Sequence, residues 1–159
     1  MSIIRLVQSS TKAPAGETDF SAACLVAPDS ILALKSLCKS DGASALDACR
    51  YLLLDLSNRS IVVRMRALSV IDILFFRSGL FRKEVSLNIR VVAQCAGFLG
   101  GKVSECTSYR DLLQHRIKEL LEIWDTCFGE FLPQIRALAR HMKEFLGMKM
   151  PDINVRFKV

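Results

Sequence analysis

Apolar residues are most concentrated between Ser60 and Arg82, where they occupy almost every position around a helical wheel. Few polar groups interrupt the stretch, mostly Arg66, Ser69, Asp72 and Arg77. A helix this apolar has to be covered by other elements on most of its sides. The pattern therefore predicts the central helix of an all-helical domain, ended by the turn Arg77-Ser78-Gly79.

Four helices are predicted before the central one. They cover residues 2–8, residues 19–26, the stretch from Ala27-Pro28-Asp29 to Ser40-Asp41-Gly42, and residues 43–57. Residues 9–18 contain Pro14 and Gly16 and predict a loop. Proline suits a first turn, glycine suits a left-handed cap and serine suits an N-cap. Pro28 is therefore expected in a first turn, Gly42 at a left-handed cap and Ser60 at an N-cap. The helix at 43–57 is predicted to bury Leu46, Cys49, Leu53 and Leu56.

Four more helices are predicted after Gly79, at residues 80–86, 87–99, 109–128 and 131–146. A loop at residues 100–111 separates the second from the third, and Ser108 with Asp111 resembles a capping box. The helix at 109–128 carries an apolar stripe of Leu112, Leu113, Ile117, Leu120, Leu121, Trp124 and Phe128. Pro133 fits a first turn and Gly147 fits a cap.

These elements predict an all-α superhelix or bundle of about seven to nine helices, without strand pattern or repeat. We expect a single domain over residues 1–147, followed by a basic tail or linker at 148–159. The apolar runs are shorter than the roughly 18 residues of a membrane span, and the beginning of the chain lacks a secretory pattern. An intracellular protein is therefore expected.

The net charge is +6, and basic residues gather in two regions. The first runs from Ile61 to Arg90 and the second from Leu132 to Val159. Such clusters serve either as solvated faces or as surfaces that attract an acidic partner. Nucleic acid is weakly indicated, because the basic residues are not interleaved with exposed aromatic residues and no nucleic-acid-binding motif accompanies them.

The six cysteines are predicted to be reduced core thiols, since none forms a C-x-x-C pair and most lie in apolar helical pattern. His115 and His141 do not stand at metal-ligand spacing, so the sequence predicts no metal and no cofactor. Asp72 is the most suggestive carboxylate, but pairing with an arginine or capping of a backbone explains it better than catalysis. With no phosphate-binding or hydrolase motif either, the chain is predicted not to be an enzyme.

Two segments resemble the VHS and ENTH superhelical domains. One is Ala67-Leu68-Ser69-Val70-Ile71-Asp72, followed by Gly79, Phe81 and Glu84-Val85. The other is Arg116-Ile117-Lys118-Glu119-Leu120-Leu121-Glu122-Ile123-Trp124. The resemblance covers residues 28–147 and implies a VHS/ENTH-like, right-handed helical superhelix.

Within that superfamily the chain is similar to the N-terminal domains of the UV-stimulated scaffold protein A family. The matching residues are Leu34 to Ser40, Val63-Arg64, Ala67, Leu74 to Ser78, Phe81-Arg82, Trp124 and Phe128-Gly129-Glu130. This resemblance implies a nuclear, chromatin-associated factor of transcription-coupled nucleotide excision repair. Such a factor docks on the Cockayne syndrome WD-repeat protein at stalled RNA polymerase II and helps to recruit TFIIH.

The residues expected to bind the protein partner are the basic ones outside the core, namely Arg66, Arg77, Arg82, Lys83, Arg136, Arg140 and Lys143. Two alternatives stay open. A trafficking adaptor would bind ubiquitin or sorting motifs, although the tryptophan that ubiquitin-binding VHS domains use is absent near Ile31. A reader of the phosphorylated polymerase II tail would bind phosphopeptides. Direct binding of nucleic acid is left undecided, and the domain is expected to be monomeric.

Overall fold

The computed structural model describes residues 2–14, 16, 19–26, 28–95 and 107–144. In this part of the chain there are nine α-helices and one 3-10 helix and no strand, as the sequence predicts. The chain divides into two compact units, residues 1–85 and residues 86–159, and each is described by itself. The expectation of one domain over 1–147 stays a prediction.

The long apolar helix of the first unit is α5, Ile61–Arg77. The Ser60 hydroxyl caps its first turn by accepting a hydrogen bond from the Val63 amide at 3.3 Å. Residues facing several directions of the helix are buried, including Leu68, Val70, Ile71, Leu74 and Phe75. The prediction of a helix covered on most sides is therefore confirmed.

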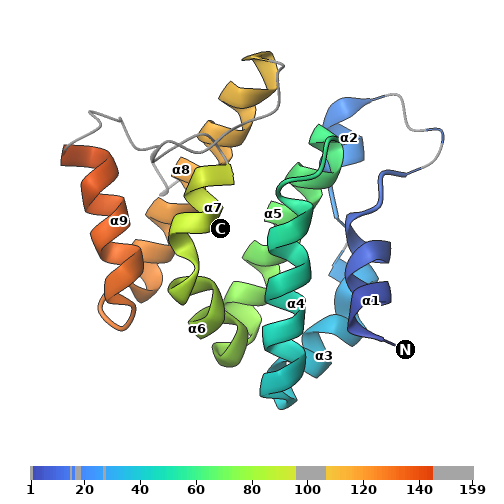
Figure 1. Cartoon of the computed structure of the whole chain (residues 1–159), viewed down its shortest axis with the longest axis horizontal. Coiled ribbons are helices and arrows are strands. Elements are labelled where there is room, and N and C mark those ends of the chain that lie inside the picture. Colours follow the sequence, from blue (N-terminus) through green and yellow to red (C-terminus); the bar gives the residue numbers. More distant parts are fainter. Residues whose placement is uncertain (1, 15, 17–18, 27, 96–106, 145–159) are drawn as a thin grey trace, which may run out of the picture. The chain divides into compact units, whose positions relative to one another are not determined.

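Helices α1 (Ile3–Thr11), α2 (Phe20–Cys24), α3 (Leu32–Ser40) and α4 (Gly42–Asp55) each pack against α5 in the first unit. A 3-10 turn, η1 (Pro28–Ile31), leads into α3 and places Pro28 at a helix start. Helix α1 also packs on α4 (Figure 1). The Thr11 hydroxyl donates a 2.8 Å hydrogen bond to the Asp55 carboxylate between these two helices.

Helix α6 (Gly79–Leu87) reaches the second unit, which continues with α7 (Ile89–Cys95), α8 (Thr107–Phe128) and α9 (Pro133–Glu144). Helix α9 packs against both α7 and α8 (Figure 1). Trp124 is fully buried, which confirms its predicted role as a core anchor. The core around it contains Ile89, Val92, Leu113, Ile117, Leu120, Leu121, Ile123, Ile135 and Met142.

Several predicted details are wrong. Gly42 does not cap α3 in a left-handed conformation: it begins α4, and the Asp41 carboxylate caps that helix by accepting from the Ala43 amide at 3.2 Å. Leu46 is 42% exposed, because the buried face of α4 is formed by Ser44, Ala45, Ala48, Cys49 and Leu52. Small residues on that face allow close packing with the neighbouring helices.

Helix boundaries also differ from those predicted. Helix α1 continues to Thr11 rather than ending at Gln8, and Ser108 lies inside α8 rather than capping it. Leu112, expected in the apolar stripe of α8, is 41% exposed. The predictions for residues 100 to 106, for Gly147 and for the tail at 148–159 lie outside the described residues. Among the described helices none combines the length and the apolarity needed to cross a membrane.

Candidate functional site

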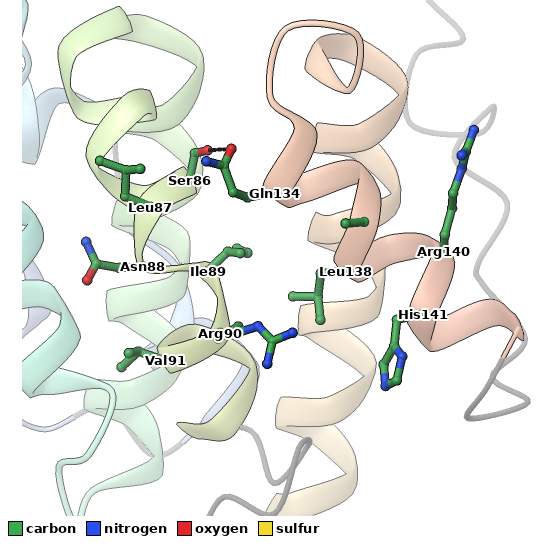
Figure 2. A pocket seen from close by; sticks show the side chains of 11 residues that line it. Ser86, Leu87, Asn88, Ile89, Arg90, Val91, Gln134, Leu138, Arg140 and His141 are labelled. Carbon is green, nitrogen blue, oxygen red and sulfur yellow. Dashed lines mark hydrogen bonds between the residues drawn. The ribbon is translucent and has the colours of Figure 1, made fainter.

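A groove of about 700 Å³ opens in the second unit between the α6–α7 segment and α9 (Figure 2). Two short stretches of sequence, some 45 residues apart, supply its walls. They are Ser86, Leu87, Asn88, Ile89, Arg90 and Val91 on one side, and Gln134, Ala137, Leu138, Arg140 and His141 on the other. Its size falls in the range of ordinary ligand-binding clefts.

The base of the groove is apolar. Ile89 and Leu138 are 4% and 6% exposed, so they are held in the core and offer only their outer edge to the groove. Leu87 and Val91, by contrast, are 59% and 40% exposed on the α6–α7 side. Exposed aliphatic side chains beside a hollow are typical of an interaction surface.

The charged groups of the groove are all basic. Arg90 and Arg140 are exposed and make no hydrogen bond or ion pair with the described residues. Figure 2 shows Arg90 extending from α7 toward Leu138, whereas Arg140 projects from the outer side of α9 and stands at the rim. His141 also lines the groove, and none of the described lining residues is an aspartate or a glutamate. This lining is complementary to an acidic ligand with apolar side chains.

A hydrogen bond ties the two walls together at one end of the groove. The Ser86 hydroxyl donates to Gln134 Oε1 at 3.2 Å, and Ser86 itself is only 2% exposed (Figure 2). This contact joins the last turn of α6 to the first turn of α9. It therefore contributes to keeping the two walls at a constant separation.

Two ion pairs hold α9 on α8. Arg136 Nε lies 3.0 Å from Asp125 Oδ1, and Lys143 Nζ lies 2.9 Å from Glu122 Oε2. Arg136 and Lys143 were both predicted to bind a partner, and in the structure both are engaged within the unit. Of the three basic residues predicted on the last helix, Arg140 is the one that lines the groove.

Arg66 does not belong to a surface. It is 9% exposed, and its guanidinium donates to three main-chain carbonyls, those of Ser10 at 3.3 Å, Ala23 at 2.9 Å and Leu25 at 2.7 Å. Burial lowers the pKa of Arg66, while the nearby Cys24 acts in the opposite direction. The side chain thus ties α1 and the end of α2 to α5, and we exclude it from the docking surface.

The remaining predicted residues lie around the end of α5. Arg82 is half-buried and donates to the carbonyls of Phe75 at 2.8 Å and Phe76 at 3.3 Å, so it closes the end of that helix. Its guanidinium also lies over the Phe75 ring, 5.9 Å from the centroid. Burial lowers the pKa of Arg82. Arg77 and Lys83 are exposed.

The cysteines fit a structural role better than a chemical one. No disulfide joins the five within the described residues, and burial raises the pKa of Cys38 to about 11. The pKa of Cys49 is raised to about 12, chiefly by burial. Cys127 is exposed, unlike the core thiols predicted, and Cys106 lies outside the described residues. Asp72 is buried and has an interaction partner within the chain.

The chain is similar to a curated protein and to solved structures, and no family model matches the sequence. The chain is 29% identical over 154 residues to a UV-stimulated scaffold protein A homolog of Arabidopsis thaliana. That alignment covers 95% of the chain but only 22% of the length of the relative.

One solved structure with a similar fold is the crystal structure of the VHS and FYVE tandem domains of Hrs, a protein involved in membrane trafficking and signal transduction. The superposition has a TM-score of 0.71 at 14% identity and covers all of this chain and 67% of the other. At this identity the likeness concerns the fold alone. The predicted VHS-type all-α fold is confirmed.

Proposed function

We propose that this VHS-like domain is a non-catalytic protein-docking module of a transcription-coupled nucleotide excision repair scaffold. The observation that carries the proposal is the similarity to a UV-stimulated scaffold protein A homolog along 95% of the chain. In such a scaffold the domain docks on the Cockayne syndrome WD-repeat protein at stalled RNA polymerase II. Other parts of the full-length protein then help to recruit TFIIH. The protein acts in the nucleus, on chromatin.

The docking site in this proposal is the groove between α7 and α9. Its lining supports the choice, because the described residues there combine exposed aliphatic groups with the arginines Arg90 and Arg140 and include no carboxylate. An acidic segment of the partner places a carboxylate on Arg90 and an apolar side chain on Ile89 and Leu138. Arg140 at the rim acts mainly on the rate of encounter, since exposed charges steer association more than they hold the complex together.

The test is a pull-down of the purified WD-repeat protein with the 159-residue chain, followed by titration in solution. Arg90→Glu should weaken binding by about tenfold or more, because a repulsive charge then stands at the mouth of the apolar floor. Arg140→Glu should act mainly on the association rate and on its salt dependence. The control is Arg5→Glu with Lys12→Glu, two exposed residues that do not line the groove. Binding unaffected by both groove substitutions rejects the groove as the docking site.

A trafficking adaptor is the second candidate, and the Hrs fold is the observation that favours it. It predicts an endosomal location and binding of ubiquitin or of sorting peptides. A reader of the phosphorylated polymerase II tail is a third, and it predicts affinity for phosphopeptides that falls as salt rises. Localising the full-length protein with and without ultraviolet damage separates these functions. Recruitment to damaged chromatin supports the repair scaffold, and a constant endosomal pattern rejects it.

A further inference from the structure

The hydroxyl of Ser78 joins three segments of the first unit. It donates a 2.6 Å hydrogen bond to the Cys38 carbonyl in the last turn of α3, and it accepts a 3.1 Å hydrogen bond from the Phe81 amide in the first turn of α6. Ser78 itself follows the last residue of α5 and is completely buried. The ends of α3 and α5 and the start of α6 are therefore held close together.

Three exposed cations stand next to these contacts, and we refer to them as the Ser78 cluster. Lys39 follows Cys38, Arg77 precedes Ser78, and Lys83 lies two residues after Phe81. None of the three makes a hydrogen bond or an ion pair with the described residues. The Ser78 hydrogen bonds thus join two separate stretches of sequence that each carry exposed positive charge.

Several carbonyls at the helix ends accept hydrogen bonds from other groups. The Phe75 and Phe76 carbonyls at the end of α5 already accept from the Arg82 guanidinium, and the Leu74 carbonyl accepts from the Ser78 amide at 2.9 Å. At the end of α3 the Leu37 carbonyl accepts from the Asp41 amide at 3.0 Å. These four carbonyls therefore do not depend on Lys39 or Arg77 for a hydrogen bond.

The neighbouring carboxylate of Asp41 is also engaged. It accepts hydrogen bonds from the Ser44 hydroxyl at 2.7 Å and from the Ala43 amide at 3.2 Å, both in the first turn of α4. The Ser44 hydrogen bond, with a smaller contribution from Ala43, lowers the pKa of Asp41, which therefore remains an anion committed to its cap. Glu84, which follows Lys83, also has an interaction partner within the chain, and the three cations outnumber these two carboxylates.

The surroundings of the cluster suit phosphates better than a peptide. The apolar side chains of Cys38, Phe75 and Phe81 are completely buried, and Leu80 is 44% exposed. A peptide ligand gains most of its affinity from apolar side chains in hollows, whereas a nucleic-acid backbone needs only positive point charges along its path. We propose that Lys39, Arg77 and Lys83 form a contact site for the phosphates of duplex DNA. This function is additional to docking, with another surface and another partner.

The experiment measures binding of the 159-residue chain to a fluorescently labelled DNA duplex of mixed sequence by anisotropy, over a series of salt concentrations. The test variant combines Lys39→Gln, Arg77→Gln and Lys83→Gln. Because each phosphate contact contributes about 0.9 to the slope of log K against log salt, the slope should fall by about 2 to 3. Affinity at about 0.1 M salt should fall by about tenfold or more, equally for different duplex sequences.

The matched control combines Arg5→Gln, Lys12→Gln and Arg59→Gln, which removes the same charge from exposed positions elsewhere in the first unit. This control should lower affinity by less than about threefold. Equal losses in the two triple variants, or no measurable binding of the unmodified chain at low salt, would overturn the proposal. The proposal would also be overturned if polyglutamate bound the chain as tightly as DNA does and the triple variant of the Ser78 cluster lost that binding too. The WD-repeat titration is run in parallel, and its outcome depends on Arg90 rather than on the Ser78 cluster.

Discussion

Arg136 and Asp125 form an ion pair, 3.0 Å from Nε to Oδ1, that lies against the backbone of Gly129. Gly129 follows the end of α8, and its amide donates to the Asp125 carbonyl at 2.8 Å. A methyl group at residue 129 would collide with the Asp125 carboxylate and carbonyl and with the Arg136 guanidinium. The α8–α9 turn therefore depends on a residue without a side chain at this position.

Gly129→Ala should consequently destabilise the protein by about 1–3 kcal/mol, since either the ion pair or the turn has to move. For a chain of this size, a loss of 1 kcal/mol corresponds to a fall in Tm of about 2–4 °C. The matched control is Gly42→Ala, because a Cβ at the start of α4 would meet nothing within 4 Å. Thermal unfolding followed by circular dichroism should show a lower Tm for the first variant and an unchanged or higher Tm for the second.

Arg66→Leu should lower the free energy of unfolding by about 2–4 kcal/mol. The substitution removes the donors that serve the carbonyls of Ser10, Ala23 and Leu25, and it leaves these acceptors in a largely buried region. Arg77→Leu is the control, since Arg77 is exposed and makes no hydrogen bond among the described residues. Urea denaturation measures both changes. Similar midpoints for the two variants would show that Arg66 does not hold α1 and α2 to α5.

Asp55→Asn should stabilise the protein at neutral pH and lose this advantage in acid. Burial raises the pKa of Asp55 above its ordinary value, and the Thr11 hydrogen bond offsets this only in part. Because the folded protein holds the Asp55 proton more tightly than the unfolded chain does, protonation of Asp55 stabilises the fold. This stabilisation is fully present below the unfolded pKa, near 3.8, and is lost as the pH rises through the folded pKa. Asparagine still accepts from Thr11 but carries no charge. Melting curves of both chains between about pH 4 and pH 7.5 should converge at the acidic end.

Thiol alkylation of the native protein should separate Cys127 from the core cysteines. Cys127 is exposed, whereas Cys38 and Cys49 are buried and their pKa values are raised. At about pH 8 the two buried thiols should react at least about a hundredfold more slowly than Cys127, because both access and thiolate fraction are low. Mass spectrometry of timed samples measures the rates, and unfolding in urea should abolish the difference. Rapid native labelling of Cys49 would contradict the packing of α4.

An element can be predicted from the sequence when the signal for it lies within the element itself. The all-round apolar character of residues 61–77 is sufficient to place α5 in a core, and Ser60 is recognisable as a cap because serine before an apolar run has few other roles. The buried face of a helix is harder to predict when alanines form it. In α4 the larger side chain of Leu46 suggests the buried face, but the residues that are buried are Ala45 and Ala48. Hydrophobicity alone does not indicate how closely two helices approach.

The candidate site is less predictable, because its parts are distant in the sequence. The charge of Arg140 is sufficient to predict a surface role, but Arg90, Leu87 and Ile89 acquire a role only when α7 and α9 are packed together. Arg66 shows the opposite case. A long basic side chain on an apolar helix suggests a surface, but here the guanidinium finds enough carbonyls to be buried. The one available signal is its setting among buried neighbours on the wheel.

The hydroxyl of Ser78 has a practical consequence for engineering the protein. One oxygen atom bonds to the end of α3 and to the start of α6 directly after the end of α5. The connection between α5 and α6 therefore leaves little room for added residues. A reporter tag, cleavage site or inserted loop placed between α5 and α6 would break the hydrogen bonds that join α3, α5 and α6. They are better introduced at Ala13 and Pro14, which are exposed and follow the end of α1.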